Sequence, residues 1–244
     1  CKRLMNGDTA RPFVFVVVLN WNSPALTSQC LASLRKATYP NVQIVVVDNG
    51  SVDGSIDDLG RAFPEAAFIR NETNRGFCGA NNQGIRFSLE KGADYVLLLN
   101  NDTIVDPLFL DPLVEALEAD PRFGAACPKI YFEVKPTVIW STGVNIHLGK
   151  WRRFFRGGRG GNMASLVFEM RGYGMEDCGQ FAKQERVSAA TGCALLMRRA
   201  ALEKVGLLDE RFFLIHEDSD WCMRAADSGY GVVFVPQSLV WHKV

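Results

Sequence analysis

Apolar runs and segments of helical spacing alternate through the first half of the chain. The apolar runs lie at residues 13–19 (FVFVVVL), 42–47, 66–70 and 95–99, and they predict four strands. Because three of these runs are apolar at almost every position, they are typical of strands buried on both faces of a parallel sheet. The order strand, helix, strand predicts right-handed crossovers and an α/β fold with a mostly parallel sheet.

Helix signals stand between these runs. Ser23 is a capping residue, Pro24 suits the first helical position, and apolar residues then recur at helical spacing up to Leu34. Two glycines in residues 74–79 favour a loop there. Further helices are expected over residues 55–63, 80–91 and 107–119.

The second half of the chain is less regular. Residues 150–184 show little periodicity and contain the glycine-rich stretch RGGRGG, so we expect a long flexible loop there. Strands are expected over residues 187–197, 232–235 and 239–241, and helices over residues 200–205 and 218–228.

This pattern predicts a single α/β domain. We expect a tail at residues 1–12 and the domain over residues 13–244, with halves at 13–130 and 131–244. The chain stops two residues after His242, which is abrupt for a final strand that needs covering, so we expect it to be part of a longer protein.

Composition narrows the class of protein. The chain has 244 residues, of which 27 are basic and 27 acidic, so it has no global field for nucleic acid or an anionic membrane. Its seven cysteines form no C-x-x-C pair, which is typical of free thiols in a reducing compartment. The longest apolar run is far shorter than the roughly 20 residues of a membrane-spanning helix. We therefore expect a cytoplasmic segment with no nucleic-acid partner.

Polar clusters follow three of the predicted strands. They comprise residues 20–22, 48–51 and 100–102. Because open α/β sheets bind ligands outside the carboxyl ends of their strands, these clusters are expected to converge on one cleft. Asp48 can accept hydrogen bonds from a ligand there, or it can bond its own turn. Asp102 can bind Mg²⁺ or Mn²⁺, or form an Asx turn.

The segment 216–221 (HEDSDW) places three acids within four residues. One carboxylate there can serve as a general base, with a pKa raised by burial or by a neighbouring charge. Acids at a helix start also favour the helix dipole, and both roles can hold together. His242 ends an apolar strand, where a structural role is the more common one.

Residues 150–159 form a basic and aromatic cluster. It suits a phosphate or an anionic lipid surface, although a solvated loop is the more common form of such a cluster. Neither G-x-x-x-x-G-K-[ST] nor G-x-G-x-x-G occurs, so the phosphate-loop and dinucleotide fingerprints are absent from the sequence.

Seven sequence islands in this order resemble the family 2 glycosyltransferases of the GT-A fold, and most closely their bacterial rhamnosyltransferase-like branch. The resemblance covers roughly residues 13–242, with an interruption over 150–184. The islands are residues 19–22 (LNWN), 47–51 (VDNGS), 74–84 (NRGF and NNQG), 98–102 (LLNND), 191–199 (TGCA and RR), 205–213 (VGLLDERFF) and 217–221 (EDSDW).

The resemblance implies inverting transfer of a sugar from a nucleotide-diphospho-sugar, dTDP- or UDP-linked, to a glycan or a lipid-linked acceptor in cell-surface polysaccharide synthesis. The first half then binds the nucleotide sugar and the second half the acceptor, at the inner face of the cytoplasmic membrane. Asp48 is implied to hold the pyrimidine base. Residues implied to line the nucleotide-sugar site are Asn20, Asn22, Asn49, Gly50, Ser51, Gly76, Asn82, Asn100 and Asn101.

The resemblance also implies the catalytic groups. Asp102 matches the metal-binding acid of the family's D-x-D element, and His242 matches a histidine that some members use as a further metal or diphosphate contact. Asp218 matches the catalytic base, with Glu217 and Asp220 near it to tune or orient it. The sequence departs from the pattern at Asn100, where D-x-D has its first acid, and this puts metal affinity in question.

Two other functions compete with transfer. A sugar-1-phosphate nucleotidylyltransferase needs a glycine-rich, basic loop after the first strand, and this chain has Asn-Trp-Asn-Ser at that place. A non-catalytic sugar-nucleotide or glycan-binding domain of the same fold is favoured by Asn100. The retained Asp102 and Asp218 argue against that second alternative.

Overall fold

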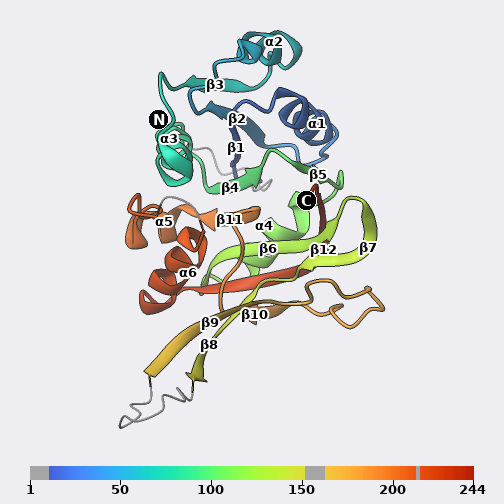
Figure 1. Cartoon of the computed structure of the whole chain (residues 1–244), viewed down its shortest axis with the longest axis vertical. Coiled ribbons are helices and arrows are strands. Elements are labelled where there is room, and N and C mark those ends of the chain that lie inside the picture. The colour runs from blue at the N-terminus through green and yellow to red at the C-terminus, as the bar shows by residue number, and fades with distance from the viewer. Residues whose placement is uncertain (1–10, 152–162, 213–214) are drawn as a thin grey trace, which may run out of the picture.

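A mixed sheet with helices on both faces forms the body of the protein (Figure 1). The computed structural model describes residues 11–151, 163–212 and 215–244. The predicted tail therefore lies almost wholly outside the described residues. Within the described residues, the strand order of the main sheet is β10-β12-β6-β11-β4-β1-β2-β3, with β5 paired to β12 and β7 paired to β6.

The first half has the predicted parallel architecture. β1 lies between β2 and β4 and is parallel to both, and β3 extends the sheet beyond β2. The strands are β1 (Val14–Asn20), β2 (Val42–Asp48), β3 (Ala67–Arg70), β4 (Tyr95–Asn100) and β5 (Thr103–Val105). The helices are α1 (Pro24–Leu34), α2 (Ser55–Ala62), α3 (Gly76–Glu90) and α4 (Leu110–Ala119).

The apolar runs supply both faces of the sheet at once. In β1, Val16 and Val18 join the core under α1, α2 and α4, whereas Phe15 and Val17 join the core under α3, α5 and α6. Alternate side chains of a strand point to opposite faces, so a run without polar positions fills two cores. This arrangement leaves the carboxyl ends of the strands as the place for polar groups.

Helix α3 begins earlier than the sequence pattern predicts. The expected loop over residues 74–79 ends at Arg75, because Gly76, with φ of 72°, turns the chain directly into the helix. Cys78 is buried against the sheet, and this packing offsets the weak helix propensity of the two glycines.

The second half adds antiparallel strands to the sheet. β11 pairs antiparallel with β4, and it joins the two halves of the protein. The elements are β6 (Phe123–Phe132), β7 (Lys135–Ser141), β8 (Val144–Trp151), β9 (Met163–Met170), β10 (Glu185–Val187), β11 (Ala194–Arg198), α5 (Arg199–Val205), α6 (Glu217–Asp227) and β12 (Gly231–His242).

Two strand predictions in this half had wrong boundaries. The expected strand over residues 187–197 is divided into β10 and β11 by a turn at residues 191–193. The two strands expected near the end of the chain are one strand, β12, with a register shift between Val235 and Leu239. A bulge of this kind lets a strand pass a proline and continue.

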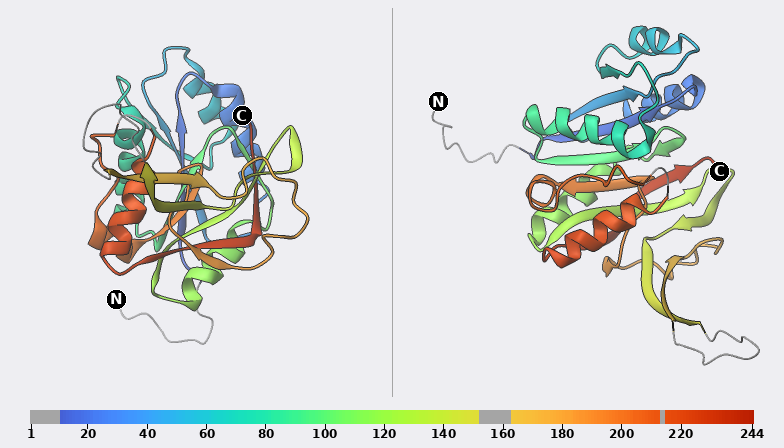
Figure 2. Two further views of the ribbon diagram at one scale, coloured as in Figure 1. Left: turned by 60° about the horizontal axis from the view of Figure 1, so that its bottom comes forward. Right: turned by 60° about the vertical axis from the view of Figure 1, so that its left-hand side comes forward.

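The prediction of a loop over residues 150–184 was wrong at residues 150–151 and 163–170, which belong to strands. β8 and β9 pair antiparallel from Val144 opposite Met170 to Trp151 opposite Met163. They form a ribbon that projects from the sheet (Figure 2). Residues 152–162 lie outside the described residues, and only the following segment up to β10 is irregular.

The irregular segment is tied to the sheet by a buried ion pair. Asp177 accepts a hydrogen bond from Lys129 Nζ at 2.7 Å and one from Tyr131 Oη at 2.5 Å. Burial opposes the ionised form of Asp177, but these hydrogen bonds hold its pKa at about 2. The segment is therefore fixed to β6 without regular secondary structure of its own.

Candidate active site

The three predicted polar clusters meet at one edge of the sheet. Strand register puts Asn20 beside Asp48, and Leu19 beside Asn100. Asn101 Nδ2 donates to Thr27 Oγ1 at 2.9 Å, and the same hydroxyl donates to Asn20 Oδ1 at 2.7 Å. The expected meeting of the clusters at one edge of the sheet is confirmed, and a cleft shared by all three stays a prediction.

Asp48 is buried and engaged in its own turn. Its Oδ1 accepts hydrogen bonds from Asn20 Nδ2 at 2.8 Å and from Ser51 Oγ at 2.5 Å, and its Oδ2 accepts one from Ser51 N at 3.2 Å. The Ser51 hydroxyl also accepts a hydrogen bond from the backbone of Asn22, which has a φ of 49°. The carboxylate therefore organises the turn, and contact with a nucleotide base stays a prediction.

Asn49 joins this turn to the start of α3. Its Nδ2 donates to Asn74 Oδ1 at 2.9 Å, and its Oδ1 accepts from Arg75 N at 2.9 Å. Gly50 has φ of 79°, and a Cβ there would lie 2.7 Å from the Thr73 carbonyl carbon. Only glycine fits such a position, so the close approach of the two loops depends on it.

Asn82, which was predicted to line the nucleotide-sugar site, holds two segments of the protein together. It is buried in α3, where Nδ2 donates to Leu208 O at 2.9 Å and Oδ1 accepts from Leu208 N at 3.1 Å. Its amide holds the segment after α5 against α3. No partner from the three polar clusters is among its hydrogen bonds within the described part of the chain, and its place in a nucleotide site stays a prediction.

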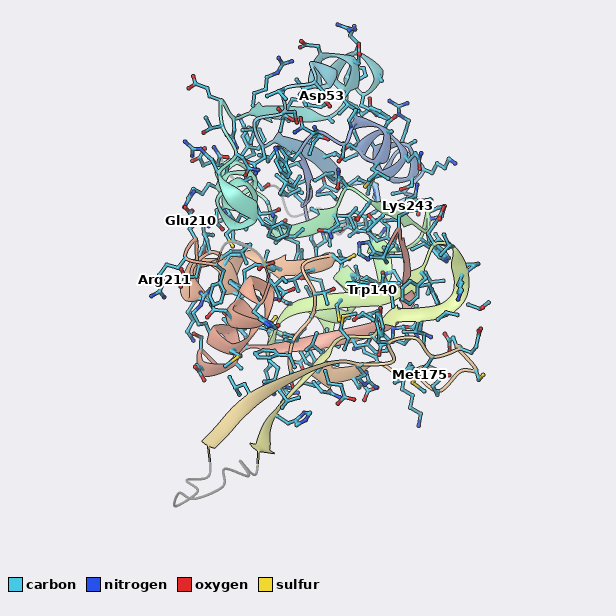
Figure 3. All side chains as sticks on the ribbon, in the orientation of Figure 1. Asp53, Trp140, Met175, Glu210, Arg211 and Lys243 are labelled. Atoms are coloured by element: carbon cyan, nitrogen blue, oxygen red, sulfur yellow. The ribbon has the colours of Figure 1, made fainter. Side chains whose placement is uncertain are left out.

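Asp102 and His242 are brought together by pairing of β5 with β12. Lys243 N donates to Asp102 O at 2.9 Å, and His242 lies opposite Thr103 in the ladder. His242 Nε2 approaches Asp102 Oδ1 to 3.1 Å, and the imidazole packs edge-on against Trp140 with ring centroids 4.4 Å apart. Figure 3 labels Trp140, on β7, and Lys243, the residue that follows the end of β12.

The donor atoms of this pair fit a divalent metal ion. Asp102 Oδ1 and both ring nitrogens of His242 are buried and form no hydrogen bond with any described residue, so their 3.1 Å approach lacks hydrogen-bond geometry. Oxygen and imidazole are ligands that Mn²⁺ accepts. The described residues hold no group of three or more such ligands, so phosphate oxygens and water would have to complete the shell.

A cavity of about 490 Å³ opens beside the pair. It brings together the end of β4, the turn before β11, the start of α6 and the end of β12. Its polar residues include Asn100, Thr191, Glu217, Asp218, Ser219 and His242, and its apolar residues include Phe77, Trp140, Val144, Phe168, Met170 and Ile215. Sequence reasoning missed Trp140, Val144, Phe168 and Met170, because they lie on β7, β8 and β9, which the pattern did not reveal.

Asp218 is held in the first turn of α6. Its Oδ2 accepts a hydrogen bond from Gly192 N at 2.7 Å, and its Oδ1 accepts one from Ser219 N. A Cβ on Gly192 would lie 3.5 Å from the Phe77 ring and 3.8 Å from the Asp218 Cβ, so the glycine lies in the cavity wall between these two residues. Asp218 thus faces the cavity with a fixed orientation.

Glu217 is the most buried acid of this group. It is 5% exposed, and its Oε2 has no hydrogen-bond partner among the residues that the structure describes. Burial, followed by the charge of Asp218, raises the pKa of Glu217. Two acids with different environments therefore stand side by side at the cavity.

The backbone before α6 is strained. Ile215 and His216 both have positive φ, at 75° and 74°, which costs roughly 1–2 kcal/mol per residue for a side chain other than glycine. The His216 ring lies 4.5 Å from that of Phe168. Strain of this kind persists where the surrounding structure over-determines it, and here it accompanies the residues that face the cavity.

The arrangement defines a class of protein. An α/β sheet with polar turns at the carboxyl ends of its parallel strands, and an acid-lined cavity beside them, is the GT-A fold of glycosyltransferases. Solved structures agree: a mannosyltransferase from Pyrobaculum calidifontis, in complex with GDP-Man and Mn²⁺, matches with TM-score 0.63 and 20% identity over 97% of this chain and 58% of its own. GalNAc-T7 with UDP, GalNAc and Mn²⁺ matches with TM-score 0.72 and 18% identity over 97% and 44%.

The sequence gives the family. Residues 15–206 match the family described as Glycosyl transferase family 2, and the chain belongs to it. The N-acetylglucosaminyl-diphospho-decaprenol L-rhamnosyltransferase of Mycobacterium tuberculosis is 28% identical over 93% of this chain and 75% of its own length. The dTDP-rhamnosyl transferase RfbF of Shigella flexneri is 22% identical over 95% and 69%. The predicted likeness to the rhamnosyltransferase branch is confirmed.

Proposed function

We propose that this chain transfers rhamnose, with inversion, from dTDP-rhamnose to a hydroxyl group of a glycan or lipid-linked acceptor in cell-surface polysaccharide synthesis. The observation that carries the proposal is the cavity that joins Asp218 to Asn100 and to the Asp102–His242 pair. The choice of sugar rests on the two rhamnosyltransferase relatives. The chain spans three quarters of the first relative and about two thirds of the second.

Asp218 is the proposed general base. As the acceptor oxygen bonds to the anomeric carbon, the bond from that carbon to the diphosphate oxygen breaks, and the acceptor proton passes to Asp218. A single displacement of this kind inverts the anomeric centre. Sugar transfer passes through an oxocarbenium-like state, so one correctly placed carboxylate suffices on the acceptor side.

Asp102 and His242 are the proposed metal-binding residues. Their unpartnered buried atoms support this assignment. A bound Mg²⁺ or Mn²⁺ would supply stabilisation of the charge that grows on the leaving diphosphate. Asn100 replaces an acid of the family pattern and lines the cavity, where its amide can donate to a ligand oxygen.

The acceptor is proposed to carry a lipid, as the name of the mycobacterial relative indicates for that enzyme, and transfer is proposed to take place at the inner face of the cytoplasmic membrane. The apolar wall of the cavity suits one face of an acceptor sugar. No helix among the described residues is long and apolar enough to span a bilayer. Peripheral contact with the membrane is part of the proposal.

Ligand-induced stabilisation tests the donor site. We expect dTDP with Mg²⁺ or Mn²⁺ to stabilise the protein more than UDP, GDP or CDP, by about 2.7 kcal/mol at 100 times the dissociation constant. That corresponds to a rise in melting temperature of roughly 5–11 °C for a chain of this size. Asp102→Ala should abolish the metal-dependent part, and the exposed Asp227→Ala should keep it. Stabilisation by no nucleotide, with or without metal, would contradict the proposal.

A further inference from the structure

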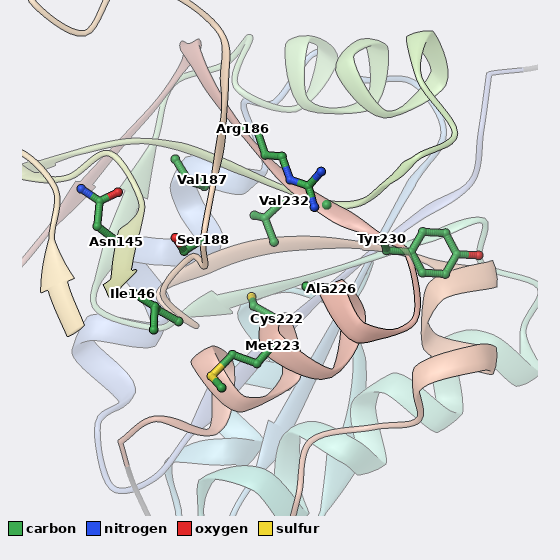
Figure 4. A pocket seen from close by; sticks show the side chains of 11 residues that line it. Asn145, Ile146, Arg186, Val187, Ser188, Cys222, Met223, Ala226, Tyr230 and Val232 are labelled. Carbon is green, nitrogen blue, oxygen red and sulfur yellow. The ribbon is translucent and has the colours of Figure 1, made fainter. Parts of the chain in front are cut away.

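A second cavity, of about 450 Å³, lies along helix α6 (Figure 4). The first turn of the helix, with Asp218 and Ser219, lines the active-site cavity. Later turns, with Cys222, Met223 and Ala226, line the second. The two cavities therefore follow one stripe of the helix, because residues four apart lie on the same face.

Strand β8 runs over the same two cavities. Val144 contributes to the active-site cavity, and the next two residues, Asn145 and Ile146, contribute to the second. From Asp218 to Ala226 the helix rises about 12 Å, at about 1.5 Å per residue. That span is comparable with one hexose ring followed by a diphosphate.

The two cavities differ in charge. Glu217 and Asp218 make the active-site cavity acidic, which suits a neutral hydroxyl group that gives up a proton. No carboxylate lines the second cavity among the described residues, whereas Arg186 does. Asn145, Ser188 and Tyr230 add neutral groups that can donate hydrogen bonds.

Arg186 is an exposed residue at the edge of this cavity. Its guanidinium group forms no ion pair or hydrogen bond with any residue in 11–151, 163–212 or 215–244. The neighbouring Arg171 is paired with Glu185, and Arg224 with Asp220. A Cβ on Gly231 would lie 3.1 Å from Arg186 Nε, so the guanidinium group lies close against β12 at the edge of the cavity.

We propose that the second cavity binds the phosphate groups of a phosphorylated acceptor, with Arg186 as the residue that recognises them. This inference rests on the proposed transfer function, because it places the acceptor hydroxyl at Asp218 and the acceptor phosphate farther along α6. Guanidinium groups bind phosphate oxygens through two parallel hydrogen bonds, which gives both affinity and orientation. The substrate class is then a sugar diphosphate rather than a neutral glycan end.

Binding measurements with the donor site filled test this inference. The protein is saturated with dTDP and Mg²⁺, so that a diphosphate probe cannot occupy the donor site. The charged probe is N-acetylglucosaminyl diphosphate with a short prenyl tail, and the uncharged probe is octyl N-acetylglucosaminide. We expect Arg186→Gln to weaken binding of the charged probe about tenfold to a hundredfold, as for loss of hydrogen bonds to a charged group.

Three controls give the result its meaning. Lys183→Gln makes the same charge change at an exposed residue outside the cavity, and it should bind the charged probe as the wild type does. Arg186→Lys should bind the charged probe more tightly than Arg186→Gln and less tightly than the wild type, since lysine keeps the positive charge but cannot donate two parallel hydrogen bonds. Binding to phosphatidylglycerol vesicles should be the same for wild type and Arg186→Gln, which separates an acceptor phosphate from a lipid headgroup.

Several results would overturn the inference. They are unchanged binding of the charged probe by Arg186→Gln, an equal loss in Lys183→Gln, an equal loss of vesicle binding, or a wild type that binds dTDP but not the charged probe. Failure of dTDP itself to bind would instead contradict the proposed function. The two failures are therefore distinguishable in the same experiment.

Discussion

Glu217 allows a quantitative test of the electrostatics of the site. The residue is 5% exposed, one carboxyl oxygen has no hydrogen-bond partner among the described residues, and burial followed by the Asp218 charge raises its pKa. Because the pKa of Glu217 is raised in the folded state, the protonated carboxyl group contributes its full share to the free energy of unfolding below the unfolded pKa of about 4.3. This contribution is lost as pH rises through the folded pKa. Glu217→Gln removes this pH-dependent loss of stability, because glutamine does not titrate.

The size of the effect has an upper limit. Each pH unit between the two pKa values costs the wild type about 1.36 kcal/mol, so at pH 7 the cost cannot exceed roughly 3.7 kcal/mol. A cost of at least about 1 kcal/mol is expected, because an unpartnered buried polar group costs about 1–3 kcal/mol. Relative to wild type, the variant should therefore gain stability as pH rises from about 4.3 to the folded pKa of Glu217, and the difference should stay constant above it.

Urea unfolding from pH 4 to pH 8 measures this difference in the free energy of unfolding. Glu72→Gln is the matched control, since Glu72 is exposed and makes the same change in charge. We expect the control to follow the wild type at every pH. Parallel curves for Glu217→Gln and wild type across the whole range would refute the reasoning.

Two further predictions concern the turn that contains Gly50 and the irregular segment that contains Asp177. Gly50→Ala should destabilise the protein by about 1–3 kcal/mol in urea unfolding, because a Cβ there meets the Thr73 backbone at 2.7 Å as well as requiring positive φ. Gly54→Ala, with positive φ but open space, should cost clearly less, and equal costs would contradict the steric argument. Asp177→Asn should cost about 3–5 kcal/mol at pH 7, because it leaves Lys129 buried without its ion pair. In wild type this contribution should be lost as pH falls from the unfolded pKa of about 3.9 through about 2, and a cost below about 1 kcal/mol would show the pair to be dispensable.

The parallel half of the fold could be predicted because its signal is local. A run such as Val14–Asn20 identifies a strand by itself, and the rule for strand ends then places Asp48 and Asn100 at one edge. The second half could not be read in this way. β6 contains glycine, alanine and proline where strands usually have branched residues, and it is a strand because β11 and β12 enclose it.

The site residues also differ in whether a local sequence pattern reveals them. Asp218 and Glu217 stand out as a dense acidic run, whereas the neighbour relation of Asp102 and His242 depends on the pairing of β5 with β12, which joins distant parts of the chain. Phe168 and Met170 went unnoticed because the ribbon strands alternate weakly between apolar and polar residues. For Asp48 the turn alternative describes the geometry directly, since its carboxylate bonds Ser51 of the same turn.

The general-base role of Asp218 is the centre of the account, and transfer kinetics test it most directly. With dTDP-rhamnose as donor and N-acetylglucosaminyl diphosphate carrying a prenyl tail as acceptor, Asp218→Asn should lower kcat about 10²- to 10⁴-fold. Its affinity for dTDP should stay within about twofold of the wild type, since only the transition state loses an interaction. Asp220→Asn, whose carboxylate pairs with Arg224 outside the cavity, should lose far less. A wild type that transfers the sugar and an Asp218→Asn variant that does so at the same rate would contradict the account.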